Sequence, residues 1–317
     1  MPNQSQYDLS TKGGKMAKIL VCGHTNMETT VAMEQFPIAY TPMRFPFFGI
    51  QTAVAGVGYN IAKALTTLGS PVNFLTLVGE DLFGQQIKQQ AEAEGLSTTY
   101  IVAGMPQTAQ AVILYDKQGR RLCNTDLKDV QKRPYPPDLF QEALQASDLA
   151  ILCNVNYTRP FLAQAQKAGI PIATDVHTIA ALDDEYNRDY MAAATILFMS
   201  DELLPLPPEQ WAKKLQAQFG TEIVVIGLGA KGALLAVKSD NFCERLPAVQ
   251  TRPVVNTIGA GDALFSAFNH FYRTSHNPYT ALQKAILFAA YKIGSDGAAA
   301  GFLTENALED LRVKSEK

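Results

Sequence analysis

The chain has 317 residues, of which 47% are hydrophobic and 18% are charged. This apolar fraction is sufficient for a large buried core and too high for an intrinsically disordered chain. Its 27 basic and 30 acidic residues give a formal net charge of −3, so there is no basic excess with which to bind nucleic acid or an anionic membrane. We therefore expect a globular protein with neither of those partners.

The cysteines and the N-terminal segment predict a cytoplasmic location. The four cysteines are far apart and form no C-x-x-C pair, so free thiols in a reducing compartment are the simplest interpretation. Residues 1–15 are polar, and no run of 18 apolar residues occurs, which argues against a secretory signal and a membrane span. We expect residues 1–15 to be a disordered tail before one folded unit at 16–317.

Short apolar runs alternate with amphipathic segments along the chain. The strand-like runs are 17–22, 73–78, 149–154, 171–176 and 222–227. The helical segments are roughly 59–69, 84–94, 138–146, 160–168, 208–219, 262–274 and 279–293. This alternation predicts βαβ crossovers and an α/β fold with a parallel sheet covered by helices on both faces. Ligands of such sheets bind beyond the carboxyl ends of the strands.

Two segments interrupt the alternation. Residues 36–54 carry three prolines and four phenylalanines, and residues 98–126 contain a hairpin pattern around Lys117-Gln118-Gly119. We expect both to form a small sheet outside the main core. Its aromatic residues would face the substrate, form a surface for a second subunit, or simply pack on their own subunit. The three in question are Phe45, Phe47 and Phe48.

The stretch NTIGAGDALF at residues 256–265 is the most informative motif. It places a glycine-rich loop, Gly259 to Gly261, at the N-terminus of an apolar helix, where free N–H groups and the helix dipole favour an anion such as a phosphoryl group. A phosphate would repel Asp262 unless that carboxylate has another task, such as accepting a hydroxyl proton. An acidic residue favoured only by the helix dipole fits the spacing equally well.

The same stretch resembles the signature D-T-x-G-A-G-D-x-F of the ribokinase-like, or pfkB, family of carbohydrate and nucleoside kinases. Three further elements resemble family motifs in the family's order. Residues 55–69 resemble its N-terminal signature, 78–84 its V-G-x-D-x-x-G element, and 227–232 its nucleotide-side T-L-G-x-x-G loop. The resemblance implies a three-layer α/β/α sandwich with a mostly parallel central sheet and a small β-sheet lid, built from about 36–54 and 98–126.

In this family Asp262 would be the general base that takes the proton of the acceptor hydroxyl. The backbone of Gly259, Ala260 and Gly261 would form the anion hole for the γ-phosphoryl group. The implied activity is ATP-dependent, Mg²⁺-requiring transfer of that group to a hydroxyl of a small sugar, sugar acid or nucleoside. The resemblance also implies a homodimer formed through the lid.

For the acceptor, the resemblance implies a pocket around its hydroxyls, and three residues after apolar strands are candidates for the same cleft. The implied residues are Asn26, Glu28, Gly56, Val57, Gly58 and Asn60, and the further candidates are Asn156, Asp175 and His177. Asn60 as a mere helix N-terminal residue and Glu28 as a solvated loop charge are the alternatives. Family members commonly have Asp at Glu28 and some have a polar residue at Val57, so we expect an acceptor other than ribose.

For the nucleotide, the resemblance implies a site on the other side of the glycine-rich loop, with adenine stacked between apolar groups. The residues are Ser200, Gly227, Gly229, Lys231, Gly232, Ala289 and Ala290. Tight helix packing would explain the two alanines equally well, and Lys231 alternatively is an exposed loop lysine.

Departures from the family pattern concern its cations. In the N-x-x-E element that organises Mg²⁺, Ser200 replaces Asn and Leu203 stands at the Glu position, which leaves Glu202 or Asp201 as substitutes. Asn256 replaces an Asp that in ribokinase-like members belongs to a monovalent-cation site, so we do not predict K⁺ activation.

These departures keep a second hypothesis open, namely a catalytically degenerate protein that binds nucleotide or sugar in a regulatory role. The intact Gly259, Gly261 and Asp262 favour an active kinase. A Rossmann-type dehydrogenase is disfavoured because Gly56-Val57-Gly58 lacks the third glycine of G-x-G-x-x-G. Sequence reasoning does not choose between a sugar and a nucleoside.

Overall fold

The computed structural model describes residues 17–315, and the tail predicted at 1–15 lies outside them. Within this range a nine-stranded sheet runs in the order β13-β12-β11-β10-β9-β8-β1-β4-β5. Its strands are β1 Lys18–Cys22, β4 Val72–Gly79, β5 Ile101–Met105, β8 Ser147–Leu152, β9 Ile172–Asp175, β10 Ile196–Ser200, β11 Ile223–Gly227, β12 Ala233–Val237 and β13 Phe242–Leu246. Neighbours from β5 to β11 pair in parallel, whereas β12 and β13 form an antiparallel edge.

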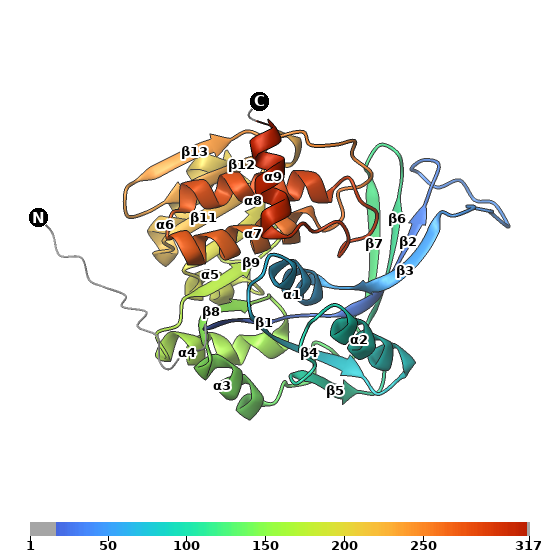
Figure 1. Ribbon diagram of the computed structural model, residues 1–317, viewed down its shortest axis with the longest axis horizontal. Coiled ribbons are helices and arrows are strands. Elements are labelled where there is room, and N and C mark those ends of the chain that lie inside the picture. The colour runs from blue at the N-terminus through green and yellow to red at the C-terminus, as the bar shows by residue number, and fades with distance from the viewer. Residues whose placement is uncertain (1–16, 316–317) are drawn as a thin grey trace, which may run out of the picture.

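Helices cover both faces of this sheet, as Figure 1 shows. On one face lie α1 Val57–Thr67, α2 Leu82–Ala93, α7 Ala260–Ser275, α8 Pro278–Lys292 and α9 Glu305–Ser315; on the other lie α3 Pro137–Gln145, α4 Arg159–Lys167, α5 Arg188–Ala193 and α6 Pro208–Phe219. Alternate residues of the central strands enter the two cores: in β1, Ile19 packs with the first helix group and Leu20 with the second. The predicted three-layer α/β/α sandwich is confirmed.

A separate four-stranded sheet, which we call the lid sheet, has the order β3-β2-β6-β7. Its strands are β2 Asn26–Ala32, β3 Ile50–Ala55, β6 Gln110–Tyr115 and β7 Arg121–Asp126. In Figure 1 it stands to the side of the helical layers, and the β2–β3 connection extends furthest from them. The predicted small sheet outside the main core is therefore present, with β6 and β7 forming the expected hairpin.

Two details of the lid sheet differ from the expectation. Strand β2 supplies a central strand that the sequence analysis did not assign. Strand β5, although it lies inside the predicted segment 98–126, joins the main sheet beside β4, because its end residues Ile101 and Met105 are buried in the two cores. Phe45, Phe47 and Phe48 are 70%, 84% and 101% exposed, so they do not pack against the body of their own subunit, although Phe45 and Phe47 stack on each other.

Within residues 17–315, no helix combines the length and the hydropathy needed to cross a membrane.

Candidate active site

Helix α7 begins in the glycine-rich loop, and no side chain caps it among the described residues. Gly259 has a φ of 75°, and a Cβ there would collide with the carbonyl oxygen of Ala298, so the position requires glycine. The N–H of Ala260 donates within the loop's own turn at 3.2 Å. Among the described residues the N–H groups of Gly259, Gly261 and Asp262 have no backbone partner, so these, rather than that of Ala260, are the donors left to bind an anion at this helix end.

The side chain of Asp262 is held by a residue from the other end of the chain. Nδ2 of Asn60, in the first turn of α1, donates to Oδ2 of Asp262 over 2.7 Å. Asn60 is buried, and its Oδ1 has no partner within the described part of the chain. Because its amide points at Asp262, Asn60 is more than a helix N-terminal residue.

The pKa of Asp262 lies above its usual range. Burial is the main cause, and the carboxylate of Asp175 adds to it. The hydrogen bond from Asn60 and the neighbouring His177 and Lys292 act in the opposite direction. A carboxylate with a raised pKa is a better proton acceptor near neutral pH than an exposed aspartate.

Glu28 lies on β2 of the lid sheet, where it is only 8% exposed. Burial, together with the carboxylate of Asp262, raises its pKa to about 7, while Lys292 and a backbone hydrogen bond from Ala298 oppose that rise. The alternative of a solvated loop charge is therefore wrong for Glu28. The lid sheet brings this carboxyl group close enough to Asp262 for the carboxylate of Asp262 to raise the pKa of Glu28.

Lys292, the last residue of α8, is a member of this cluster that the sequence analysis missed. It is completely buried, and its Nζ donates to the carbonyl oxygens of Ile258 and, over 2.9 Å, Gly297. Burial lowers its pKa to about 8, against the opposing influence of nearby carboxylates. A lysine in an otherwise apolar helix end was the signal that could have singled it out.

The start of α1 packs tightly on the turn at residues 23–25. A Cβ on Gly56 would come within 2.8 Å of that turn's backbone, and one on Gly58 would collide with it, so both glycines serve this close approach. Val57 is partly buried and packs against the core, and its contact with an acceptor stays a prediction. Asn26, at the start of β2, is buried with an unpartnered Oδ1 within the described residues.

Two of the three cleft candidates lie near the loop. Oδ2 of Asp175 is 4.0 Å from where a Cβ of Gly261 would stand, and Nδ1 of the half-exposed His177 is 3.9 Å from Oδ1 of Asp175. Asn156 instead forms two hydrogen bonds with Gln131, one from its N–H and one from its side-chain amide. These bonds join Asn156 to a residue 25 positions earlier in the chain, and its contact with an acceptor stays a prediction.

The residues predicted for the nucleotide lie at two neighbouring strand ends and on α8. They are Ser200, Gly227, Gly229, Lys231, Gly232, Ala289 and Ala290. Ser200 and Gly227 are register partners at the carboxyl ends of β10 and β11, so these two meet at the predicted edge of the sheet. Lys231 is exposed, and Ala289 is half-buried against the core.

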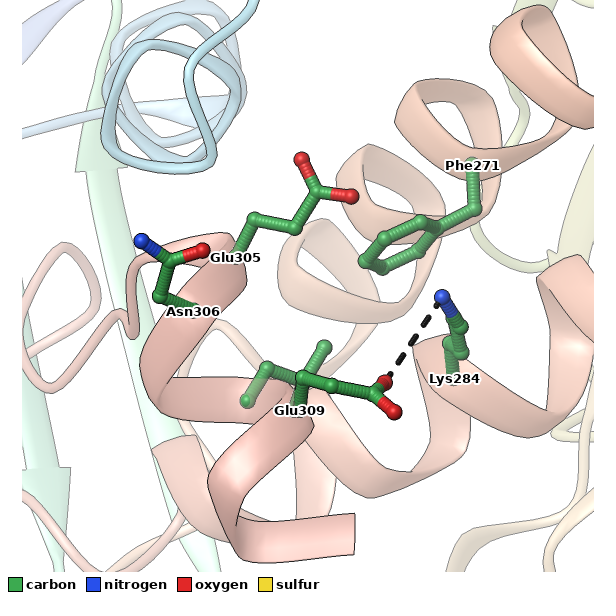
Figure 2. A pocket seen from close by; sticks show the side chains of 6 residues that line it. Phe271, Lys284, Glu305, Asn306 and Glu309 are labelled. Carbon is green, nitrogen blue, oxygen red and sulfur yellow. Dashed lines mark ion pairs between the residues drawn. The ribbon is translucent and has the colours of Figure 1, made fainter.

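A hollow of about 180 Å³ lies elsewhere, between α7, α8 and α9. Figure 2 shows its lining side chains, with the ammonium of Lys284 facing the carboxylate of Glu309 at 3.9 Å and Phe271 beside them. A second hollow, of about 520 Å³, lies on the β6–β7 face of the lid sheet. Neither hollow is lined by Asp262 or the glycine-rich loop.

Comparison with known proteins decides the family. A model of the pfkB family of carbohydrate kinases matches residues 16–305. The chain belongs to the pfkB family. The predicted family and enzyme class are thereby confirmed: the protein is a carbohydrate or nucleoside kinase, a phosphotransferase with an alcohol group as acceptor.

Several relatives match this pfkB chain over most of its length. A deoxyribokinase of Salmonella typhi is 26% identical over 301 residues, which cover 90% of this chain and 95% of that protein. An ATP-dependent ribose-1-phosphate kinase of Halopiger xanaduensis is 25% identical over 290 residues, covering 89% and 94%. Among solved structures, a microbiome-derived acarbose kinase superposes with a TM-score of 0.85 at 24% identity, covering 94% of this chain and all of that one.

The donor set of this pfkB chain suits a magnesium ion carried by nucleotide phosphates. Residues 17–315 contain no cluster of three or more His, Cys, Asp or Glu side chains able to hold a metal. Mg²⁺ bound with phosphates needs only one or two carboxylates and keeps several waters. Asp201 and the exposed Glu202 directly follow β10, at the edge of the sheet predicted for the nucleotide, and their carboxylates fit that mode of Mg²⁺ binding.

Proposed function

We propose that the protein transfers the γ-phosphate of ATP to a hydroxyl of a small sugar, sugar acid or nucleoside, with Asp262 as general base and the Gly259–Gly261 loop as anion hole. The observation that supports this proposal most directly is the 2.7 Å hydrogen bond from Asn60 that fixes the carboxylate of Asp262 beside the uncapped N-terminus of α7. That bond occupies Oδ2 and leaves Oδ1 of Asp262 to accept a proton from the acceptor.

The chemistry demands positioning and charge stabilisation more than covalent participation. The N–H groups at the start of α7 and the helix dipole would stabilise negative charge on the transferring group. Asn60 would keep the base in line with that group. Mg²⁺, held by the nucleotide with Glu202 or Asp201, would neutralise phosphate charge when bound.

On the acceptor side, the buried oxygens Oδ1 of Asn26 and Oδ1 of Asn60 lack donors among the described residues. Buried acceptors without partners are costly, and the hydroxyl groups of a polyol would satisfy them. Glu28, from the lid sheet, would accept or donate a further hydrogen bond according to its protonation. The relatives include a deoxyribokinase and an acarbose kinase, which supports a carbohydrate acceptor.

The nucleotide would lie across the strand ends that Ser200 and Gly227 mark, with Gly229, Lys231 and Gly232 along its phosphates. Ala289 and Ala290 of α8 would contact the adenine. We further propose that residues 16–317 form one kinase domain with lid segments at about 36–54 and 98–126, and that two copies pair through the lid. The exposed aromatic residues of the β2–β3 connection support this pairing.

The test is ADP release by the purified protein with Mg-ATP across a panel of sugars, sugar acids and nucleosides, with Asp262→Asn assayed beside it. We expect release that depends on one acceptor class and is lost in the variant. Measurable ATP binding without release for every acceptor would instead favour the degenerate, regulatory alternative.

A further inference from the structure

Lys292 is a buried cation whose partners are backbone carbonyl groups. Lysine is almost never fully buried without a paired charge, yet Lys292 forms no ion pair among residues 17–315. The oxygens of Ile258 and Gly297 accept its two hydrogen bonds. Two carbonyl oxygens that converge on one point carry partial negative charge, so the site that they form is one for a cation.

These two carbonyl groups belong to residues that flank a close backbone contact in the candidate active site. Ile258 directly precedes Gly259, and Gly297 directly precedes Ala298, whose carbonyl oxygen leaves no room for a Cβ on Gly259. The ammonium of Lys292 therefore joins the glycine-rich loop to the segment that follows α8. If the ammonium were absent, the two carbonyl dipoles would face each other without a donor between them.

Two further hydrogen bonds join the same two segments. Nδ2 of Asn256 donates to Oδ1 of Asp296 over 2.8 Å, and the N–H of Val255 donates to the carbonyl of Ile293 over 2.8 Å. These bonds hold the segments in register, but neither reaches Gly259. The last residue before the loop is fixed from the α8 side by Lys292.

We infer that Lys292 is a positioning residue whose ammonium serves as a built-in monovalent cation: it holds the glycine-rich loop in the shape that receives the phosphoryl group and makes the reaction independent of dissolved K⁺ or Na⁺. The inference rests on the proposed function of that loop. Lys292 acts through the loop backbone and does not itself touch the reacting atoms.

The charged groups around Lys292 explain why its side chain stays protonated although it is buried. Carboxylates of Asp262 on α7, Glu28 on the lid sheet and Asp296 after α8 favour its charged form, while Arg121 on β7 disfavours it. Burial dominates and brings the pKa down to about 8. The positive charge is therefore present at neutral pH and is lost as the pH rises through about 8.

The experiment compares Lys292→Ala with Lys284→Ala, a matched control on the same helix whose ammonium is partly exposed. Turnover is measured in buffers with tetramethylammonium as the only monovalent cation, then with added ammonium or potassium. We expect wild type and Lys284→Ala to be indifferent to the added ions. Lys292→Ala should lose about 100-fold in kcat and recover about tenfold or more with ammonium, which fits the vacated site.

Thermal unfolding provides a readout that needs no turnover. Ammonium should raise the Tm of Lys292→Ala and leave those of wild type and Lys284→Ala unchanged. Full activity of Lys292→Ala without added ions overturns the inference, and so does a loss that neither ion restores together with an unchanged Tm. If Lys292→Ala does not fold in any salt, the wild-type assay decides, because activation of wild type by K⁺ contradicts a built-in cation.

The two proposals fail in different ways. Absence of acceptor-dependent ADP release in wild type would reject the proposed function, while the Tm response of Lys292→Ala to ammonium would still report on the cation site. Conversely, if wild type is active and neither the activity nor the Tm of Lys292→Ala responds to added ammonium or potassium, only the role of Lys292 is rejected.

Discussion

The glycine-rich loop and the lid sheet both contribute to the candidate active site, yet they are built in opposite ways. Around the loop, Gly259 contacts backbone on the α8 side and Lys292 is completely buried. In the lid, β7 is exposed along its whole length and Phe48 is fully exposed. Backbone contacts therefore fix the conformation of the loop, whereas the lid exposes side chains that can contact a ligand or another subunit. Substitutions should lower activity and stability strongly in the loop and only slightly in the lid.

The largest expected effect is that of Asp262→Asn on turnover. Removing a positioned general base costs typically 10²–10⁴-fold, and we expect a fall in kcat of about 1,000-fold because Asn cannot take the proton. The side-chain oxygen of Asn can still accept the hydrogen bond from Asn60, so the local structure should be kept. The affinity for ATP, measured by calorimetry, should therefore stay unchanged. Turnover close to that of wild type would remove Asp262 from the mechanism.

The next largest effect is expected for Gly259→Ala in the loop, with Gly119→Ala in the lid hairpin as the matched control. Both glycines have a positive φ, 75° and 80°, but only at Gly259 would the new Cβ collide with another segment. We expect Gly119→Ala to cost about 1 kcal/mol of unfolding free energy from backbone strain alone, and Gly259→Ala about 3 kcal/mol or more together with activity. Denaturant unfolding measures both. Equal losses would show that the loop is no more constrained than the lid hairpin.

Glu28 allows a pH-dependent test at the junction of the two regions. Its folded-state pKa of about 7 exceeds the ordinary value of 4.5, so the folded state favours the protonated carboxyl group. This contribution is fully present below about pH 4.5 and is lost as the pH rises through 7. Relative to Glu28→Gln, wild type should therefore lose on the order of 2 kcal/mol of stability between these limits.

The measurement is the difference in unfolding free energy between wild type and Glu28→Gln at pH 5 and pH 8, with Glu34→Gln as an exposed control. A difference that does not change with pH would mean that Glu28 titrates as an ordinary surface glutamate.

The smallest effect on the folded chain is expected in the β2–β3 connection. Phe47→Ser and Phe48→Ser remove exposed side chains, so the free energy of unfolding of the isolated chain should change by less than about 0.5 kcal/mol. If the lid forms the proposed dimer, the double variant should elute as a monomer in size-exclusion chromatography with light scattering. A wild type that is monomeric at micromolar concentration would contradict the pairing.

Much of the fold could be predicted because its signals are local. Apolar β-branched runs and amphipathic segments give the alternation of the main sheet, and the glycine spacing before Asp262 marks a helix N-terminus. Strand β2 was missed because its residues 26–32 mix polar and apolar side chains within a few residues of β1. The antiparallel edge, β12 and β13, was missed because its hairpin interrupts the βαβ pattern.

The candidate site could be predicted only for residues that lie within a recognisable sequence motif. Asn60 and Asp262 each lie in a family motif, and the structure brings them into contact. Lys292 lies in no such motif, and a lysine at a helix C-terminus is ordinarily exposed and favoured by the helix dipole. Only the approach of Ile258 and Gly297, which sequence spacing does not reveal, buries it. For Asn156 the sequence likewise did not reveal its partners, because its N–H and side-chain amide donate to Gln131, 25 residues earlier in the chain.

The hydrogen bond between Asn60 and Asp262 joins residues 202 positions apart. Contacts of such long range form late, because a large loop must close before they can contribute. Local helices can form early in a refolding experiment while the base is still unaligned. Recovery of catalytic competence should therefore lag behind recovery of the helical circular dichroism signal, and on the ribosome no active site can exist until α7 has emerged and packed against α1.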